Sequence, residues 1–253
     1  MMRLFDQSKG RFLFWLDSRL VNVFPIYRRY TDIKISGHKQ ATEFMMNAQQ
    51  RVDLQDLRQA ARDRNQEQMQ YLLKRLLQDL SFFVALSIPL ERIYSFLDIF
   101  ESYYPEEEWV RKLVLAINSF GMPPDDRIVE IALEQPFNAP GIGNFVKAVY
   151  DATQAMQSRH TREARLGYIA SAIVNTIMAE LAESWYGDRV EDWQRVRQNQ
   201  YDPINGEYSD PVATEIAYQF WIDPQTAALD TGSWLEVADS IEQKFRRMER
   251  GES

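Results

Sequence analysis

Four polar side chains, two in each of two parts of the chain, have the chemistry that a divalent cation requires. Asp125 and Asp126 are adjacent, and Asn175 and Glu183 lie eight positions apart in a segment with helical periodicity. Carboxylate and amide oxygens are hard ligands, and Mg²⁺ in proteins often binds such groups together with the phosphates of a substrate. If the two pairs faced one cavity, they could hold Mg²⁺ against a diphosphate.

This arrangement loosely resembles the two metal-binding motifs of the all-α isoprenoid synthases. The resemblance implies an Mg²⁺-dependent enzyme acting on an isoprenoid or other diphosphate, with Asp125, Asp126, Asn175 and Glu183 as metal ligands. The chain departs from the family pattern, because Ala179 replaces a hydroxyl residue and the motifs are only about 50 positions apart. The two aspartates also follow two prolines, where acids of a first helical turn are common. We keep this enzyme as an alternative interpretation.

Other catalytic chemistry has little support in the composition. The chain contains no cysteine and two histidines, which excludes thiol nucleophiles and cysteine-ligated metal sites. Gly141 and Gly143 do not form a dinucleotide fingerprint, because no strand precedes them. The sequence therefore predicts no cofactor, and a catalytic function is the less favoured one.

Charge is unevenly distributed along the chain. The net charge is −8, but residues 1–40 carry eight Lys and Arg against three acids, which gives +5 and leaves −13 for the rest. Affinity for phosphate comes mostly from Lys and Arg, so the total argues against general nucleic-acid binding. Contact with nucleic acid or an anionic membrane through residues 1–40 alone remains a further alternative.

Aromatic residues gather in two regions and are candidates for binding a partner protein, because aromatic and arginine side chains dominate interface energetics. The candidates are Arg11, Phe14, Trp15, Arg19, Tyr27, Arg28, Arg29 and Tyr30 in the N-terminal segment, and Trp185, Trp193 and Trp221 nearer the C-terminus. Aromatic clusters also build cores, so the tryptophans could be internal. Likewise, residues 1–40 could dock on the acidic remainder of the chain or on a separate partner.

Apolar periodicity predicts helices throughout the first half of the chain. The clearest is a helix over 65–86, and a looser stripe predicts another over 41–62. The intervening stretch 58–68 is polar and could be a solvated helix or a loop. The apolar stripe of 65–86 consists of Met69, Leu72, Leu73, Leu76, Leu77, Leu80, Phe83 and Val84. Prolines followed by acids predict short helices over 89–104, 106–120 and 124–134.

The second half contains the expected central helix. After a loop at 135–144 and a further helix, Thr161 is expected to cap a helix over 162–186. Its residues Gly167, Ser171 and Asn175 form a narrow strip of small side chains that would admit a neighbouring helix. Residues 199–211 are rich in turn formers and could contain a tight hairpin. A short helix is expected over 212–221, and Ser233 with Glu236 resembles the capping box of a last helix.

Together these patterns predict an all-α fold of about ten helices, packed as antiparallel hairpins around the 162–186 helix. We expect a basic, aromatic-rich segment over 1–40 and a body over 41–253, with a boundary near 158–161 as an alternative. The apolar stretches are shorter than the roughly 20 residues of a membrane helix, and the apolar runs near the N-terminus are short and broken by charges, so a cytoplasmic location without a secretory signal is predicted. The favoured function is a non-catalytic adaptor, assembly factor or regulator that binds another protein.

Overall fold

The structure is a computed structural model that describes residues 46–118, 137–202 and 204–250. These ranges contain nine helices and one short hairpin, so the predicted all-α class is confirmed. The elements are α1 (Ala48–Arg62), α2 (Gln66–Gln78), α3 (Phe82–Tyr103), α4 (Glu108–Asn118), α6 (Ile142–Met156), α7 (Arg162–Tyr186), α8 (Val190–Gln198), β1 (Tyr201–Asp202), β2 (Glu207–Tyr208), α9 (Pro211–Ile222) and α10 (Pro224–Glu249). The helix expected over 124–134 and the segment 1–40 lie outside the described residues.

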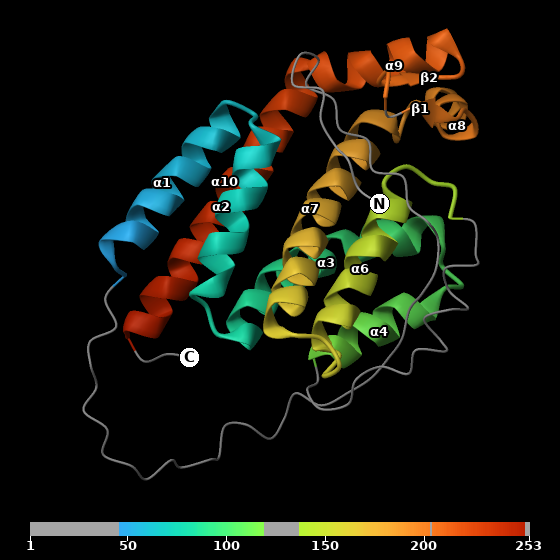
Figure 1. Cartoon of the computed structure of the whole chain (residues 1–253). Helices are drawn as coiled ribbons and strands as arrows, with labels where there is room; N and C mark the ends of the chain where they lie inside the picture. Colours follow the sequence, from blue (N-terminus) through green and yellow to red (C-terminus); the bar gives the residue numbers. More distant parts are fainter. Residues whose placement is uncertain (1–45, 119–136, 203, 251–253) are drawn as a thin grey trace, which may run out of the picture.

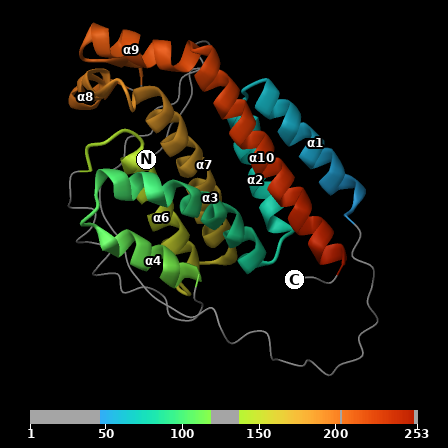
Figure 2. The same ribbon diagram turned by 180° about the vertical axis from the view of Figure 1, so that it is seen from behind.

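The helices form two groups that meet along α7. Figure 1 shows α1, α2 and α10 side by side, with α3, α4, α6 and α7 next to them, and the reverse view in Figure 2 shows the same grouping. The small elements α8, α9 and the β1–β2 hairpin lie together at one end. Helix α7 packs against α2, α3, α6, α8 and α10, and it pairs most extensively with α6. The expectation that the 162–186 helix is central is therefore confirmed.

Side-chain caps define where several helices begin. The backbone N–H of Ala164 donates to the Thr161 hydroxyl at 3.2 Å, so α7 begins where the sequence predicts. At α1, Asn47 and Gln50 each accept a hydrogen bond at 2.8 Å from the other's backbone N–H, which is a full capping box. The same end of α1 is tied to the end of the C-terminal helix, because the backbone N–H of Met46 donates to the Glu249 carboxylate.

The predicted helix over 65–86 is in fact two helices. Helix α2 ends at Gln78, and Ser81 precedes the first residue of α3. The turn between them redirects the chain, so Leu76 remains in the core at 1% exposure whereas Phe83 is 53% exposed. The predicted start at Pro89 is also wrong, because Pro89 lies buried inside α3. Because proline has no backbone N–H, α3 lacks one helical hydrogen bond at this position.

The polar stretch 58–68, predicted to be either a solvated helix or a loop, contains the end of α1, a short turn and the start of α2. Helix α1 continues to Arg62, and a short turn through Arg64 leads into α2 at Gln66. Arg64 adopts a φ of 51°, in the left-handed region that few non-glycine residues occupy. Its guanidinium donates to the Trp221 carbonyl at 3.1 Å, which holds the turn against the end of α9.

The C-terminal helix begins earlier than the capping-box pattern predicts. Helix α10 starts at Pro224, and the Asp223 side chain accepts hydrogen bonds at 2.9 Å from the backbone N–H groups of Gln225 and Thr226. Ser233 and Glu236 therefore lie within α10 and do not cap it. The hairpin expected in 199–211 is present, with Tyr201 paired to Tyr208.

The strip of small residues on α7 is only partly what the sequence predicts. Ser171 and Asn175 face α6. A Cβ atom built on Gly167 would meet no atom within 4 Å, so the prediction of a close helix contact at Gly167 is wrong. The tight approach lies instead at Gly141, which has a φ of 74° and precedes α6. A Cβ atom there would come within 2.2 Å of the Ala179 carbonyl oxygen.

Most buried apolar side chains form one continuous cluster. It contains residues from α1, α2, α3, α4, α6, α7, α9 and α10, and thus from both sides of residues 158–161. Across the described ranges, none of the helices is both long and apolar enough to cross a bilayer.

Leu76 and Phe83 provide a matched pair for testing the core. Leu76→Ala should lower the free energy of unfolding by about 2–5 kcal/mol, because it removes buried methyl groups and leaves a cavity. Phe83→Ala should change it by roughly 0.5 kcal/mol or less, because the ring is mostly exposed. Urea unfolding of both variants measures the difference, and equal effects would contradict this placement of the α2–α3 turn.

Gly141 and Gly167 provide a second pair. Gly141→Ala should destabilise the protein by more than about 1 kcal/mol, because alanine is strained at positive φ and would collide with the Ala179 carbonyl. Gly167→Ala should stabilise it by up to about 1 kcal/mol, because alanine favours a helix interior and has room there. Thermal denaturation of the two variants should therefore shift in opposite directions. A shared loss of stability would place a close helix contact at Gly167 after all.

Candidate functional site

A groove of about 550 Å³ opens between α3, α7 and α10. Its accessible apolar side chains are Ala228 and Leu229 on α10, while Ile88 on α3 and Val237 on α10 form its buried base. Gly232 also faces it, and a Cβ atom at that position would meet nothing within 4 Å. A concave site of this volume, apolar with a few polar groups, has the size and character of small-ligand sites in proteins.

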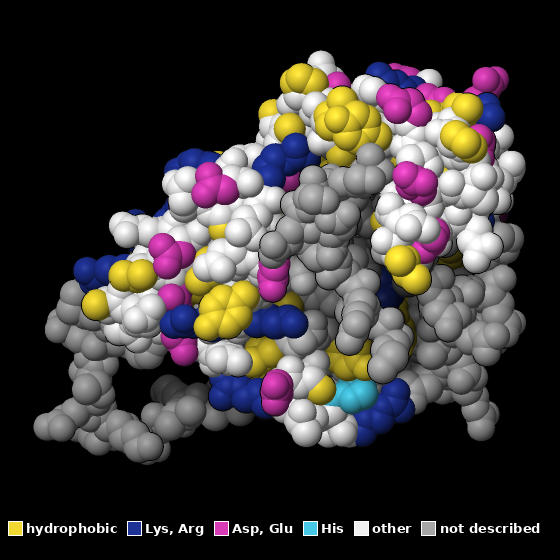
Figure 3. Space-filling view, turned by 45° about the horizontal axis from the view of Figure 1, so that its top comes forward, with side chains coloured by type: hydrophobic (Ala, Val, Ile, Leu, Met, Phe, Trp, Pro, Cys, Tyr) yellow, Lys and Arg dark blue, Asp and Glu magenta, His cyan; other side chains and the backbone are white. Residues whose placement is uncertain are grey.

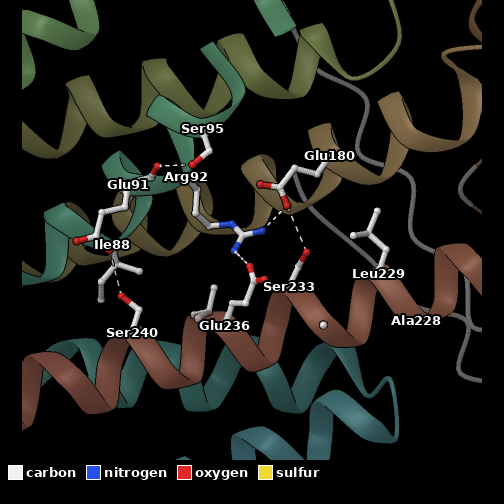
Figure 4. A pocket seen from close by; sticks show the side chains of 12 residues that line it. Ile88, Glu91, Arg92, Ser95, Glu180, Ala228, Leu229, Ser233, Glu236 and Ser240 are labelled. Carbon is white, nitrogen blue, oxygen red and sulfur yellow. Dashed lines mark hydrogen bonds and ion pairs between the residues drawn. The ribbon is translucent and has the colours of Figure 1, made fainter. Parts of the chain in front are cut away.

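Arg92 crosses the groove and joins all three helices. Its guanidinium pairs with the Oε2 atom of Glu180 on α7 and, at 3.1 Å, with the Oε2 atom of Glu236 on α10. The Ser233 hydroxyl donates to the same Glu180 oxygen at 3.2 Å. Figure 4 shows these four side chains converging between the helices. The guanidinium therefore links α3 to both neighbouring helices.

The three charged side chains differ in their access to water. The side chains of Arg92 and Glu180 are 12% and 24% exposed, whereas that of Glu236 is 74% exposed. Burial raises the pKa of Glu180 above its ordinary value, and this effect exceeds the opposing attraction of Arg92 and the hydrogen bond from Ser233. A carboxyl group with a shifted pKa in a cleft is a recognised sign of a functional site.

A second ion pair closes one end of the groove. The Lys244 ammonium pairs with Glu91, whose other carboxylate oxygen accepts a hydrogen bond from Ser240 at 3.3 Å. Along α10 the groove thus runs from Ser240 at one end, past Glu236 and Ser233, to the apolar side chains of Leu229 and Ala228 at the other.

A separate surface lies where α2, α3 and α7 come together, and we call it the basic face. It consists of Lys74, Arg75, Arg159, Arg162 and Arg165 with the aromatic residues Tyr71 and Phe83. The two rings are 55% and 53% exposed. Figure 3 shows dark-blue Lys and Arg side chains gathered along the lower edge of one side of the molecule, with a hydrophobic ring among them.

Contacts across the helices hold the basic face together. The Arg162 guanidinium donates to the carbonyl oxygens of Gln78 and Leu80, at 2.8 and 3.3 Å, which joins α7 to the end of α2. The Arg165 guanidinium lies 3.6 Å from the centroid of the Phe82 ring. Among the residues that the structure places, neither Arg162 nor Arg165 pairs with a carboxylate. Their charge is therefore not cancelled locally.

The tryptophans predicted from the sequence gather around Tyr186 and Phe220. Ring centroids are 6.2 Å apart for Trp185 and Phe220, and 5.2 Å apart for Tyr186 and Trp193. Trp221 is buried, while Trp185 and Trp193 are half-buried against the same core. This placement agrees with the interpretation of the cluster as internal packing.

The residues of the metal-binding alternative are not brought together in the described part of the chain. The Asn175 amide donates to the buried Asp151 carboxylate at 3.3 Å, so it takes part in the packing of α7 on α6. Glu183 lies two turns further along α7, and Asp125 and Asp126 are outside the described residues. No group of three His, Asp or Glu side chains within 46–118, 137–202 and 204–250 is suited to hold a metal ion.

The N-terminal partner-binding candidates cannot be placed. Arg11, Phe14, Trp15, Arg19, Tyr27, Arg28, Arg29 and Tyr30 all lie outside the described residues.

Neither the groove nor the basic face is predicted from the sequence. Arg162 and Arg165, three positions apart in the expected 162–186 helix, indicate one positively charged side at its start, whereas Arg159 precedes that helix. The groove has no comparable signal, because its walls come from three distant segments.

Comparison of the chain with models of known protein families, with curated proteins and with solved structures found no match.

The raised pKa of Glu180 predicts a particular pH dependence of stability. Because folding raises the pKa of Glu180, its contribution to stability is complete below its ordinary pKa of 4.5 and is lost as the pH rises through the folded value. Glu180→Gln removes this titration. The free energy of unfolding of the wild type, relative to that of the variant, should therefore fall as the pH increases above 4.5.

Urea unfolding of both proteins at a series of pH values measures this difference. Asp239→Asn is a suitable control, because Asp239 lies on α10 and pairs with Arg58 away from the groove. A relative stability that rises with pH would show that attraction by Arg92 outweighs burial at Glu180.

Proposed function

We propose that the protein is a non-catalytic interaction module, an adaptor, assembly factor or regulator, that binds an acidic partner protein through its basic face. The observation that carries this proposal is the exposure of two aromatic rings, Tyr71 and Phe83, among clustered cations of a chain whose net charge is −8. Residues 71–83 and 157–168 together hold five Lys and Arg and two acids, Asp79 and Glu163, and a third acid, Asp53 on α1, pairs with Arg75 at 3.0 Å.

The physical argument rests on the different contributions of the two kinds of side chain. Positive charge attracts an acidic partner from a distance and raises the rate of encounter. Burial of aromatic rings and arginine side chains supplies most of the affinity at protein interfaces. Tyr71 and Lys74 belong to the same surface of α2, so one partner could contact a ring and a cation together.

Residues 1–40 offer the same chemistry in greater amount. Their charge of +5 and seven aromatic residues would suit an acidic surface, either on the partner or on the body of this chain. We propose the N-terminal segment as a second element of the same interaction. It is not needed for the test of the basic face that follows.

Affinity capture with the full chain tests the proposal. The bait Tyr71→Ser/Lys74→Glu should retain its fold, because both side chains are exposed, and should recover about tenfold less of the partner than the wild type recovers. The control bait Tyr218→Ser/Arg247→Glu makes the same chemical changes on α9 and α10, and should recover the wild-type amount.

Mass spectrometry identifies what is captured, and thermal denaturation checks that both baits are folded. Acidic proteins recovered by the wild type and the control but lost from the basic-face variant would support the proposal. Equal recovery by all three baits would contradict it. Loss of the captured material after nuclease treatment would instead favour nucleic acid as the partner.

A further inference from the structure

The charges that line the groove do not balance. Glu91, Glu180 and Glu236 face two cations, Arg92 and Lys244. Lys244 is committed to Glu91, so the single guanidinium of Arg92 serves both Glu180 and Glu236. When both are ionised, two carboxylates that share one cation leave a net charge of −1 at this point of the groove.

The oxygen atoms that remain available are on the two carboxylates that share Arg92. Glu180 and Glu236 both use Oε2 for the guanidinium, and Ser233 also donates to the Glu180 Oε2 atom. No hydrogen bond from the described part of the chain reaches Oε1 of either residue. Figure 4 shows the two carboxylates extending from α7 and α10, with Ser233 near both.

Apolar surface continues from these oxygens along the groove. Leu229 and Ala228 follow Ser233 toward one end of the groove, and the buried Ile88 lies on the α3 side. Gly232 leaves additional space, because it carries no side chain. A ligand could thus place a charged group at the carboxylates and a hydrocarbon stem against Leu229 and Ala228.

We propose that this groove binds an organic cation, an ammonium or guanidinium group carried on an apolar stem. An ammonium group has three donors and no acceptor, which matches two uncommitted carboxylate oxygens beside a serine hydroxyl. Charge-assisted hydrogen bonds of this kind are stronger than neutral ones. A bare metal ion fits less well, because the described carboxylates do not form a cluster suited to metal coordination.

Calorimetric titration of the full chain with three six-carbon probes tests the chemistry of the site. Hexylamine should bind with a stoichiometry of one, 1-hexanol more weakly because it lacks the charge, and hexanoate not at all because the carboxylates repel it. Binding of hexanoate as tight as that of hexylamine would overturn the proposal, and so would the absence of hexylamine binding.

Two variants locate the binding in the groove. Glu180→Gln should weaken hexylamine binding by about tenfold or more, since a hydrogen bond between charged groups is replaced by a neutral one. Gly232→Leu should abolish binding by filling the groove, and the open space around Gly232 allows the variant to fold. Asp239→Asn, on another side of α10, should bind as the wild type does. Unchanged binding in both groove variants would place the amine elsewhere and contradict the proposal.

The source of the cation is distinguished by a fourth probe. N-acetyl-lysine methylamide carries the same ammonium and stem as a lysine within a polypeptide. If it binds as tightly as hexylamine, with the same loss in Glu180→Gln, the groove accepts a lysine side chain. If only hexylamine binds, the groove accepts a free amine. Either result supports an organic-cation site.

Discussion

The carboxylate of Asp151 has no exposure to water and lies between the two most extensively paired helices. A buried charge is costly unless other groups compensate it. Lys147 pairs with one of its oxygens, and Ser171 at 2.6 Å and Asn175 at 3.3 Å donate to the other. Burial nevertheless raises the pKa of Asp151 above its ordinary value. Ser171 and Asn175 fix how α6 sits along α7, since sliding either helix would disturb both of their hydrogen bonds and leave the carboxylate with Lys147 of its own helix.

The position of α7 in turn determines the groove. Glu180 lies five residues beyond Asn175, so the contact that orients Asn175 toward α6 also directs Glu180 toward α3 and α10. Arg92 and Ser233 can meet it only because α3 and α10 both cross α7 at that height. Small residues at Gly232 and Ser233 keep α10 from filling the space beside the ion pair. The groove is therefore a consequence of packing among helices that are distant in the sequence.

Sequence signals predicted the structure correctly where one local residue determines it, as a helix cap or a turn residue does. Thr161 begins α7, and the hairpin places Gly206 at a φ of 71°, as expected for a glycine in a tight turn. Local signals failed where tertiary packing overrides them. Pro89 normally favours a helix start, yet it is buried in the middle of α3.

The predicted start of the last helix at Ser233 is wrong for the same reason. Helix α10 continues through Gly232, because Trp234 and Val237 pack in the core. The candidate sites divide in a similar way. The basic face has a partial signal in the helical spacing of Arg162 and Arg165, whereas nothing local indicates that Arg92 meets Glu180, which is 88 positions away.

The hydrogen bond between Met46 and Glu249 brings the start of α1 beside the end of α10, so the two helices run antiparallel with these ends adjacent. Tension applied between Met46 and Glu249 would separate the helices from that end and load their contacts one after another. The next charged link along the pair, from Arg58 to Glu242 and Asp239, would bear the force only after the first had opened. We therefore expect the body to peel apart at low force when it is pulled through these two points, however stable its core is toward urea.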